Sequence, residues 1–183
     1  MPTFRLHALL LAAALASVAA TGNCAADPPP AAAQTVRKPG CAAPEYRQFD
    51  FWLGDWDAFE ADDPKTVIAR THVDLVAAGC AVHELYEQAD GLVGDSILSF
   101  DAVRKAWQQT WVTNFGSLMV ISGRLVDGAL TLEGEVHSGS GKTLRQLITW
   151  KREGDDVRES STISGDDGQN WEPAFDVLFR RHR

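Results

Sequence analysis

The stretch HELYE, from His83 to Glu87, holds the most concentrated set of side chains that could do chemistry. If it is a β-strand, alternate side chains point to opposite faces, so Glu84 and Tyr86 share one face. A carboxyl group and a phenol on the inner face of a barrel would give a cavity a polar end. A buried carboxyl there is also a candidate acid/base.

A second stretch, WQQTW, places Trp107, Gln109 and Trp111 on one strand face, which would be aromatic and amide-bearing. Arg145 and Arg158 lie on later predicted strands and are candidate buried cations. Polar groups among aromatic walls are typical of small-molecule sites. We therefore predict a ligand site formed from Glu84, Tyr86, Gln109, Trp111, Arg145 and Arg158. The alternative is that the tryptophans are plain core and that Glu84 pairs with Arg145 or Arg158 as a structural salt bridge.

The stretch FDFWLGDWD, Phe49 to Asp57, contains three carboxylates that we do not expect to converge. Asp50 falls on a predicted helix, Asp55 at the turn that follows, and Asp57 on the strand face opposite Trp56. A catalytic pair of carboxyl groups is therefore not predicted here.

Other catalytic and metal-binding patterns are missing from the sequence. His72, His83 and His137 lie on or beside three separate predicted strands, and neither His-x-His nor His-x-x-x-His occurs. The glycine-rich stretches SGSGK and GDDG do not lead from a strand into a helix, which argues against a phosphate-binding loop. We predict no metal site and no cofactor, and the sequence assigns no catalytic residue.

The N-terminal region resembles an export signal. Residues 1–26 have a basic start at Arg5, an apolar run and then small residues, as in a signal peptide cleaved after Ala20 or Ala26. Lipidation at Cys24 remains an alternative. Residues 27–40 are rich in proline and alanine and predict a disordered linker. The folded domain is then 41–183, in a periplasmic or secreted protein without a stable membrane span after cleavage.

The charge balance limits the class of partner. The chain has 17 basic and 25 acidic side chains, and residues 1–26 contain one basic residue and no acid, so the remainder carries 16 − 25 = −9. An acidic surface argues against nucleic acid and anionic lipid as partners. The expected partner is a small apolar or amphiphilic molecule. The sequence predicts no oligomeric state.

Cys41 and Cys80 are the cysteines of the predicted domain. In an exported protein they predict a disulfide, although two separate buried thiols are the alternative.

The periodicity predicts one short helix followed only by strands. The helix covers 44–53, where Tyr46, Phe49, Trp52 and Leu53 form an apolar stripe and Gly54 follows the last turn. Turn residues separate ten segments with strand-like alternation, at 55–60, 66–76, 81–88, 95–101, 107–113, 117–126, 129–136, 143–151, 157–164 and 171–181. We predict an all-β fold, an antiparallel up-and-down barrel of 8–10 strands. A two-sheet sandwich is the alternative.

Gly54-x-Trp56, with a helix before it and FDVLFRRHR at the end of the chain, resembles the start and end of calycin barrels, the lipocalins and their relatives. The resemblance implies that the helix plugs one end of the barrel and that Trp56 lies across its floor. It also implies that Arg180 or Arg181 stacks on Trp56 and reaches backbone carbonyls.

The link SGDDGQNW, Ser164 to Trp171, resembles the Asp-box turn of other hairpins. That resemblance implies that Asp166 binds backbone amides and that Trp171 packs beneath them, in a rigid hairpin without an implied activity.

The chain resembles an uncharacterised exported bacterial family of DUF1579-like type, which has a lipocalin-like fold. The resemblance rests on four stretches that occur in the same order: CAAPEYRQFDFWLGDWD, GCAVHE, WQQTWV and the Asp-box. The family implies fold and export and no established reaction. This chain has Glu159, Ser161 and Thr162 where relatives tend to carry glutamine, tryptophan and glutamate.

We therefore predict an exported protein that binds a small, partly apolar ligand inside a β-barrel. One alternative is an enzyme, an isomerase or hydrolase, that uses the same cavity with Glu84 as acid/base. Another is a structural or interaction barrel without a ligand.

Overall fold

The computed structural model describes residues 40–183. The predicted signal peptide, Cys24 and nearly all of the predicted linker lie outside the described residues.

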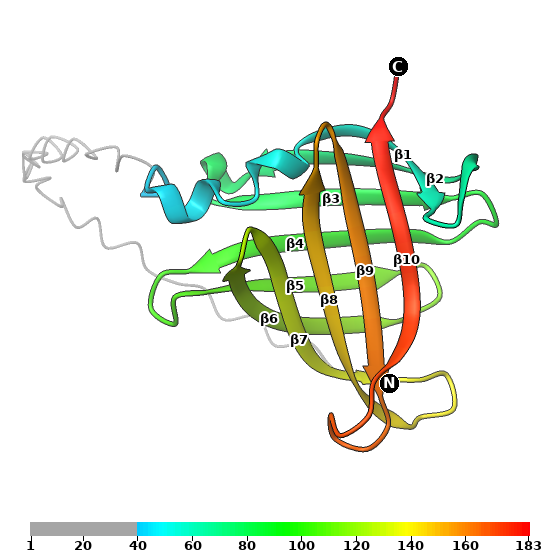
Figure 1. Cartoon of the computed structure of the whole chain (residues 1–183). Helices are drawn as coiled ribbons and strands as arrows, with labels where there is room; N and C mark the ends of the chain where they lie inside the picture. The colour runs from blue at the N-terminus through cyan, green and yellow to red at the C-terminus, as the bar shows by residue number, and fades with distance from the viewer. Residues whose placement is uncertain (1–39) are drawn as a thin grey trace, which may run out of the picture. The chain divides into compact units, whose positions relative to one another are not determined.

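Ten antiparallel strands form a closed barrel in which each strand pairs with the next and β1 also pairs with β10 (Figure 1). The prediction of an all-β up-and-down barrel is confirmed, at the upper end of the expected strand number. The strands are β1 (Gly54–Glu60), β2 (Asp63–Val76), β3 (Ala81–Gln88), β4 (Val93–Asp101), β5 (Ala106–Thr113), β6 (Leu118–Val126), β7 (Ala129–His137), β8 (Thr143–Glu153), β9 (Asp156–Ser164) and β10 (Glu172–Arg181).

The N-terminal segment is two short 3₁₀ helices rather than the single predicted helix. They are η1 (Pro44–Arg47) and η2 (Asp50–Trp52), and Phe49 between them has φ −109° and ψ 9°, outside the helical region. A third, η3 (Ala77–Gly79), joins β2 to β3. Because side chains three apart share one side of a 3₁₀ helix, Phe49 and Trp52 still face inward together.

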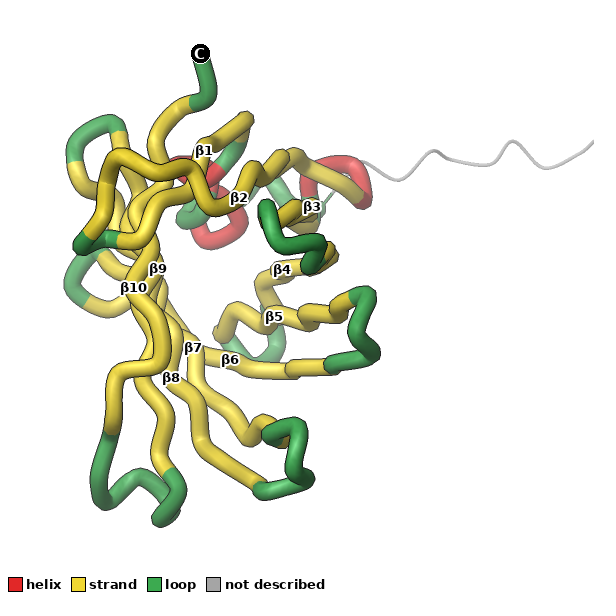
Figure 2. The backbone as a smooth tube through the Cα atoms, turned by 90° about the vertical axis from the view of Figure 1, so that its right-hand side faces the viewer, coloured by secondary structure: helices red, strands yellow, loops and turns green. Residues whose placement is uncertain are grey.

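An aromatic cluster fills the end of the barrel beside η1 and η2. Trp52 stacks on Trp56 with ring centroids 5.3 Å apart and meets the edge of Phe179 at 4.5 Å. Phe49 contacts Trp150 edge to face at 5.8 Å. All five side chains are buried. In the backbone view the helical segments lie beside β1, β2 and β3 (Figure 2). The aromatic cluster therefore plugs this end of the barrel.

Arg181 joins the end of the chain to this cluster. Its guanidinium lies 3.8 Å from the ring centroid of Trp56, and its Nη1 donates a hydrogen bond to the carbonyl of Leu53 at 2.5 Å. Gly54 has φ +123°, and a Cβ there would lie 2.1 Å from Arg181 Nη1. Glycine is therefore required both by the backbone conformation and by the close approach of the arginine.

Arg180, the other candidate for this role, points to the outer face. It donates to the carbonyl of Pro64 at 2.8 Å and lies 5.0 Å from the ring centroid of Phe59. Strand alternation explains the difference, because adjacent residues of β10 face opposite sides.

The β9–β10 hairpin has the hydrogen bonds expected of an Asp-box. Asp166 accepts from Ser164 Oγ at 2.7 Å and from the amide of Asn170 at 2.9 Å, and Trp171 Nε1 donates to the carbonyl of Gly168 at 3.1 Å. The Asn170 side chain, followed by Ser164, lowers the pKa of Asp166 to about 2. These bonds support a structural role for the turn.

The predicted disulfide between Cys41 and Cys80 is confirmed. It ties the segment before η1 to the start of β3, and Arg47 donates to the carbonyl of Gly79 beside it. The plug is therefore held covalently to the barrel wall.

Reduction of this disulfide should destabilise the fold. The bridge spans 39 residues, and loop closure of that length is worth about 4 kcal/mol in the chain-entropy model. Urea unfolding with and without reductant measures the loss. A variant with both Cys41→Ser and Cys80→Ser should be insensitive to reductant, and an equal response of both proteins would contradict the prediction.

Substitution of Arg181 should weaken barrel closure. Arg181→Met removes a cation–π contact and a charged hydrogen bond, so we expect the free energy of unfolding to fall by about 2 kcal/mol. Arg183→Met, two residues further along, is the matched control and should change it by less than about 0.5 kcal/mol. Equal losses in the two variants would show that the contact with Trp56 has no special role.

Candidate functional site

A cavity of about 480 Å³ lies inside the barrel. Its lining includes Leu92, Ser117 and His137, which lie in or beside the β3–β4, β5–β6 and β7–β8 connections. In an up-and-down barrel these connections lie at the end opposite the chain's entry into β1. The cavity therefore opens away from the plug, and its deep end includes Phe179, which contacts the plug through Trp52.

The lining combines apolar walls with polar groups. Aliphatic and aromatic side chains form most of the walls, among them Ile68, Trp111, Met119, Ile148, Phe175 and Phe179. The polar groups include three carboxyls and three amides, from Glu60, Glu84, Glu159, Gln88, Gln109 and Gln146, together with Tyr86, Ser117 and His137.

Four of the six predicted ligand-site residues line this cavity: Glu84, Tyr86, Gln109 and Trp111. Trp107 is buried in the aromatic core nearer the plug, where its Nε1 donates to Gln48 Oε1 at 3.0 Å. Ligand binding by the four residues stays a prediction, but they share one space.

Arg145 and Arg158 do not belong to the cavity lining. Arg145 pairs with Glu133 and, at 3.2 Å, with Asp167, and Arg158 forms an ion pair with Asp176. The inward-facing neighbours on their strands are Gln146 and Glu159. Because adjacent residues alternate across a strand, the arginines face outward. Neither is an ion-pair partner of Glu84 among the described residues, so the alternative of a Glu84 salt bridge is not realised.

Glu84 is buried at mid-strand in β3 and is held by two hydroxyl groups. Thr71 Oγ1 shares its hydrogen between Oε1 at 3.2 Å and the carbonyl of Leu85 at 2.9 Å, and Ser96 Oγ donates to Oε2 at 3.4 Å. Gln109 Nε2 donates in turn to Ser96 Oγ at 3.4 Å. Burial raises the pKa of Glu84 to about 7, although the two hydroxyl hydrogen bonds favour the charged form and oppose the rise.

Glu159 is the second deep carboxyl, and it is absent from the predicted set of site residues. Protein surrounds it except where it faces the cavity. Burial, followed by the charge of Glu84, raises its pKa well above the usual value, and the nearby Trp150 indole partly offsets this. Strand alternation identifies it: Glu159 lies two residues from both Val157 and Ser161, which are buried, so it shares their inward face. If Val157 and Ser161 face inward on β9, then Glu159 and not Arg158 faces the cavity.

Trp111 and Tyr86 form the aromatic wall beside Glu84. Their ring centroids are 6.0 Å apart at an interplanar angle of 67°, and Tyr86 donates from its hydroxyl to Gln88 Oε1 at 3.2 Å. The Trp111 ring occupies the place of a side chain at Gly94, where a Cβ would lie 2.0 Å from it. Burial raises the pKa of Tyr86, so its hydroxyl stays a hydrogen-bond donor.

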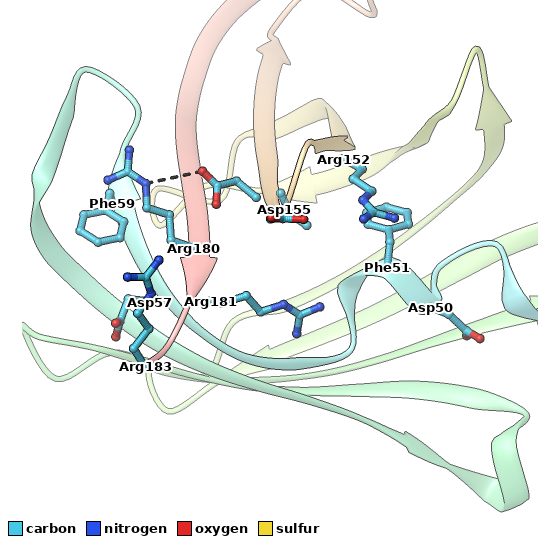
Figure 3. Close-up of a pocket in the computed structure, with 11 residues that line it drawn as sticks. Asp50, Phe51, Asp57, Phe59, Arg152, Asp155, Arg180, Arg181 and Arg183 are labelled. Carbon is cyan, nitrogen blue, oxygen red and sulfur yellow. Dashed lines mark ion pairs between the residues drawn. The ribbon is translucent and has the colours of Figure 1, made fainter.

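A larger hollow, of about 920 Å³, lies outside the barrel at the plugged end (Figure 3). Arginines and aspartates line it together, and Arg180 pairs with Asp156 at 3.6 Å. Arg180 and Arg181 are already bonded to the carbonyls of Pro64 and Leu53. Because these cations stabilise the barrel, we assign the functional site to the interior cavity.

Within residues 40–183, no helix is both long and apolar enough to cross a membrane. The same part of the chain contains no cluster of three or more His, Cys, Asp or Glu side chains arranged to hold a metal ion.

The buried carboxyls should make stability depend on pH. The folded pKa of Glu84 lies above its unfolded value of 4.5, so the unfolded chain loses this proton first and stability falls as pH rises from about 4.5 to 7. The loss attributable to Glu84 is about 3 kcal/mol. Urea unfolding of wild type and Glu84→Gln at pH 5, 6, 7 and 8 measures it, and the variant should be the more stable at pH 8.

Two controls isolate this effect. Glu87→Gln lies on the same strand but on the exposed face, and should follow the wild-type curve. The hydrogen bond with Asp95 raises the pKa of His83, so deprotonation of His83 also lowers the stability of the protein as pH rises. This contribution is present in both wild type and Glu84→Gln. Parallel curves for wild type and Glu84→Gln would show that Glu84 titrates normally.

No protein-family model matches the sequence, and no curated protein is significantly similar to it. The resemblances to calycin barrels and to the DUF1579-like family therefore rest on the sequence motifs alone. The barrel architecture rests on the strand pairing described above.

Proposed function

We propose that this protein binds a small, partly apolar molecule inside its barrel. The observation that carries the proposal is the interior cavity of about 480 Å³, which is plugged at one end and lined by apolar walls with a few polar groups. That volume falls within the range of small-molecule sites, roughly 300–1,000 Å³. It argues against a barrel filled by its own side chains.

We further propose that the protein acts after export, in the periplasm or outside the cell. The signal-like residues 1–26 and the Cys41–Cys80 disulfide support this, since disulfides persist in oxidising compartments. Membership of the exported DUF1579-like family is a proposal that agrees with both.

Blocking the cavity should abolish binding. The neutral fluorescent probe N-phenyl-1-naphthylamine should bind wild type saturably, and Val136→Trp, which fills space in the cavity lining, should weaken binding at least about tenfold, or about 1.4 kcal/mol. Glu135→Trp places the same side chain at the adjacent, outward position and should bind like wild type. Unsaturable binding to wild type, or equal effects of the two variants, would refute the proposal.

A second candidate is an isomerase or hydrolase with Glu84 as acid/base. The observation that favours it is a carboxyl inside a cavity with a pKa raised to about 7, which suits general acid–base catalysis at neutral pH. Both oxygens of Glu84 already accept hydrogen bonds, from Thr71 and Ser96. A reacting group would therefore have to approach beside these hydroxyls. Turnover by wild type that survives in Glu84→Gln would exclude this role.

A further inference from the structure

We infer that the cavity selects organic cations, molecules with a protonated amine and an apolar body, and that Glu84, Glu159 and the carbonyl oxygen of Gln109 bind the ammonium group. The inference rests on the proposed function and specifies the class of ligand.

The charge of the lining is the first argument. Among the described residues that line the cavity, the acidic groups are Glu60, Glu84 and Glu159, and none of the lining residues is lysine or arginine. His137, at the end of β7 beside the mouth, is the one basic residue in the lining. A cation that enters meets complementary charge, whereas an anion meets carboxyl groups without a compensating arginine.

The direction of the hydrogen bonds is the second argument. Because Ser96 Oγ donates to Glu84, it accepts from Gln109, which must present its amide nitrogen there. The Oε1 atom of Gln109 is then left buried without a partner in the described part of the protein, on a side chain only 3% exposed. The interior therefore offers a carbonyl acceptor that lacks a donor, in a cavity that also contains the carboxyl groups of Glu84 and Glu159, and an ammonium group supplies donors only.

The walls match the rest of such a ligand. Trp111 and Tyr86 stand edge to face beside Glu84, and both rings can attract a cation through their faces. Beyond them, Met119, Ile148 and Phe175 provide apolar surface for a hydrocarbon body. A molecule with one charged end and one apolar end therefore satisfies both parts of the lining.

The pKa values of Glu84 and Glu159 are consistent with the release of a proton when a cationic ligand binds. Burial raises the pKa of Glu84 to about 7, and burial, followed by the charge of Glu84, raises the pKa of Glu159 well above its usual value. At neutral pH the pair retains a proton, because two neighbouring buried carboxylates repel each other. An ammonium group that binds between them takes over this neutralisation, and the proton is released to solvent.

The groups that act on Glu84 come from each neighbouring element. They are Thr71 on β2, His83 on its own strand, and Ser96 and Asp95 on β4. Glu159 on β9 also faces the cavity, and the charge of Glu84 raises its pKa. Thr71, Ser96 and His83 favour the charged form, whereas burial and Asp95 favour the neutral form.

Three compounds that differ only in the end group test the inference. 4-Phenylbutylamine, 4-phenylbutanol and 4-phenylbutyrate compete with N-phenyl-1-naphthylamine for the purified protein, at pH 5.5 and at pH 8. At pH 8 we expect the amine to bind at least about tenfold more tightly than the alcohol, and the acid to bind most weakly. The affinity for the amine should fall about tenfold at pH 5.5, where the carboxyls hold their protons, while that for the alcohol should not change.

Glu84→Gln and Glu159→Gln should each reduce the ratio of amine to alcohol affinity at least about tenfold, whereas Glu87→Gln on the outer face should leave it unchanged. If the probe binds but the amine does not exceed the alcohol, or the acid binds best, the cation inference is overturned and ligand binding stands. If the probe and all three compounds fail to bind, the proposed function itself is overturned. The comparison of the amine, the alcohol and the acid on wild type tests the inference even if a variant does not fold.

Discussion

The contact between Arg181 and the start of β1 closes the barrel. One guanidinium stacks on Trp56 and hydrogen-bonds the carbonyl of Leu53, so the last strand is fixed to the turn that leads into the first. With β10 held there, β1 pairs on both edges and the barrel has no free edge strand. The same contact sets the plug of η1 and η2 at one end, which leaves the interior open only at the other.

Two carboxyl groups, from Glu84 and Glu159, are buried in the interior at an energetic cost that packing does not explain. A chain selected for stability alone would place apolar side chains at positions 84 and 159, because burial of carboxyl groups disfavours their charged forms. The hydroxyl groups of Thr71 and Ser96 reduce this cost for Glu84. Buried ionisable groups with shifted pKa values are concentrated at functional sites, and this pair lies in a cavity. This energetic cost therefore supports a site rather than a filled core.

Local patterns in the sequence were sufficient to predict the strands, because turn residues separate segments whose alternation is clear. The ten observed strands agree with those expected, apart from their ends. The predicted helix was less accurate, since Phe49 leaves the helical region and splits it. The disulfide followed from the cysteine count and the export signal.

The inward parity of β8 and β9 was not predictable from residue type. Arg145 and Arg158 are predicted as buried cations, but each belongs to the outer set of its strand and pairs there with a carboxylate. One position further along β9 is Glu159, which does face the cavity. An alternating strand with polar residues on both faces fits either register, and only pairing with the neighbouring strands decides between them.

The corrected parity changes the chemistry of the interior. With Arg145 or Arg158 inside, Glu84 would have a fixed counter-ion and the cavity would be close to neutral. The arginines instead lie on the outer face and around the plugged end, where Arg152, Arg180, Arg181 and Arg183 border the outer hollow (Figure 3). No lysine or arginine among the described residues of the lining neutralises the deep carboxyls, so protons take much of this role. Protons exchange with solvent, and a ligand can replace them, whereas a lysine or arginine fixed in the wall would remain. This separation of the cations from the cavity is what makes the interior responsive to pH and receptive to a positively charged guest.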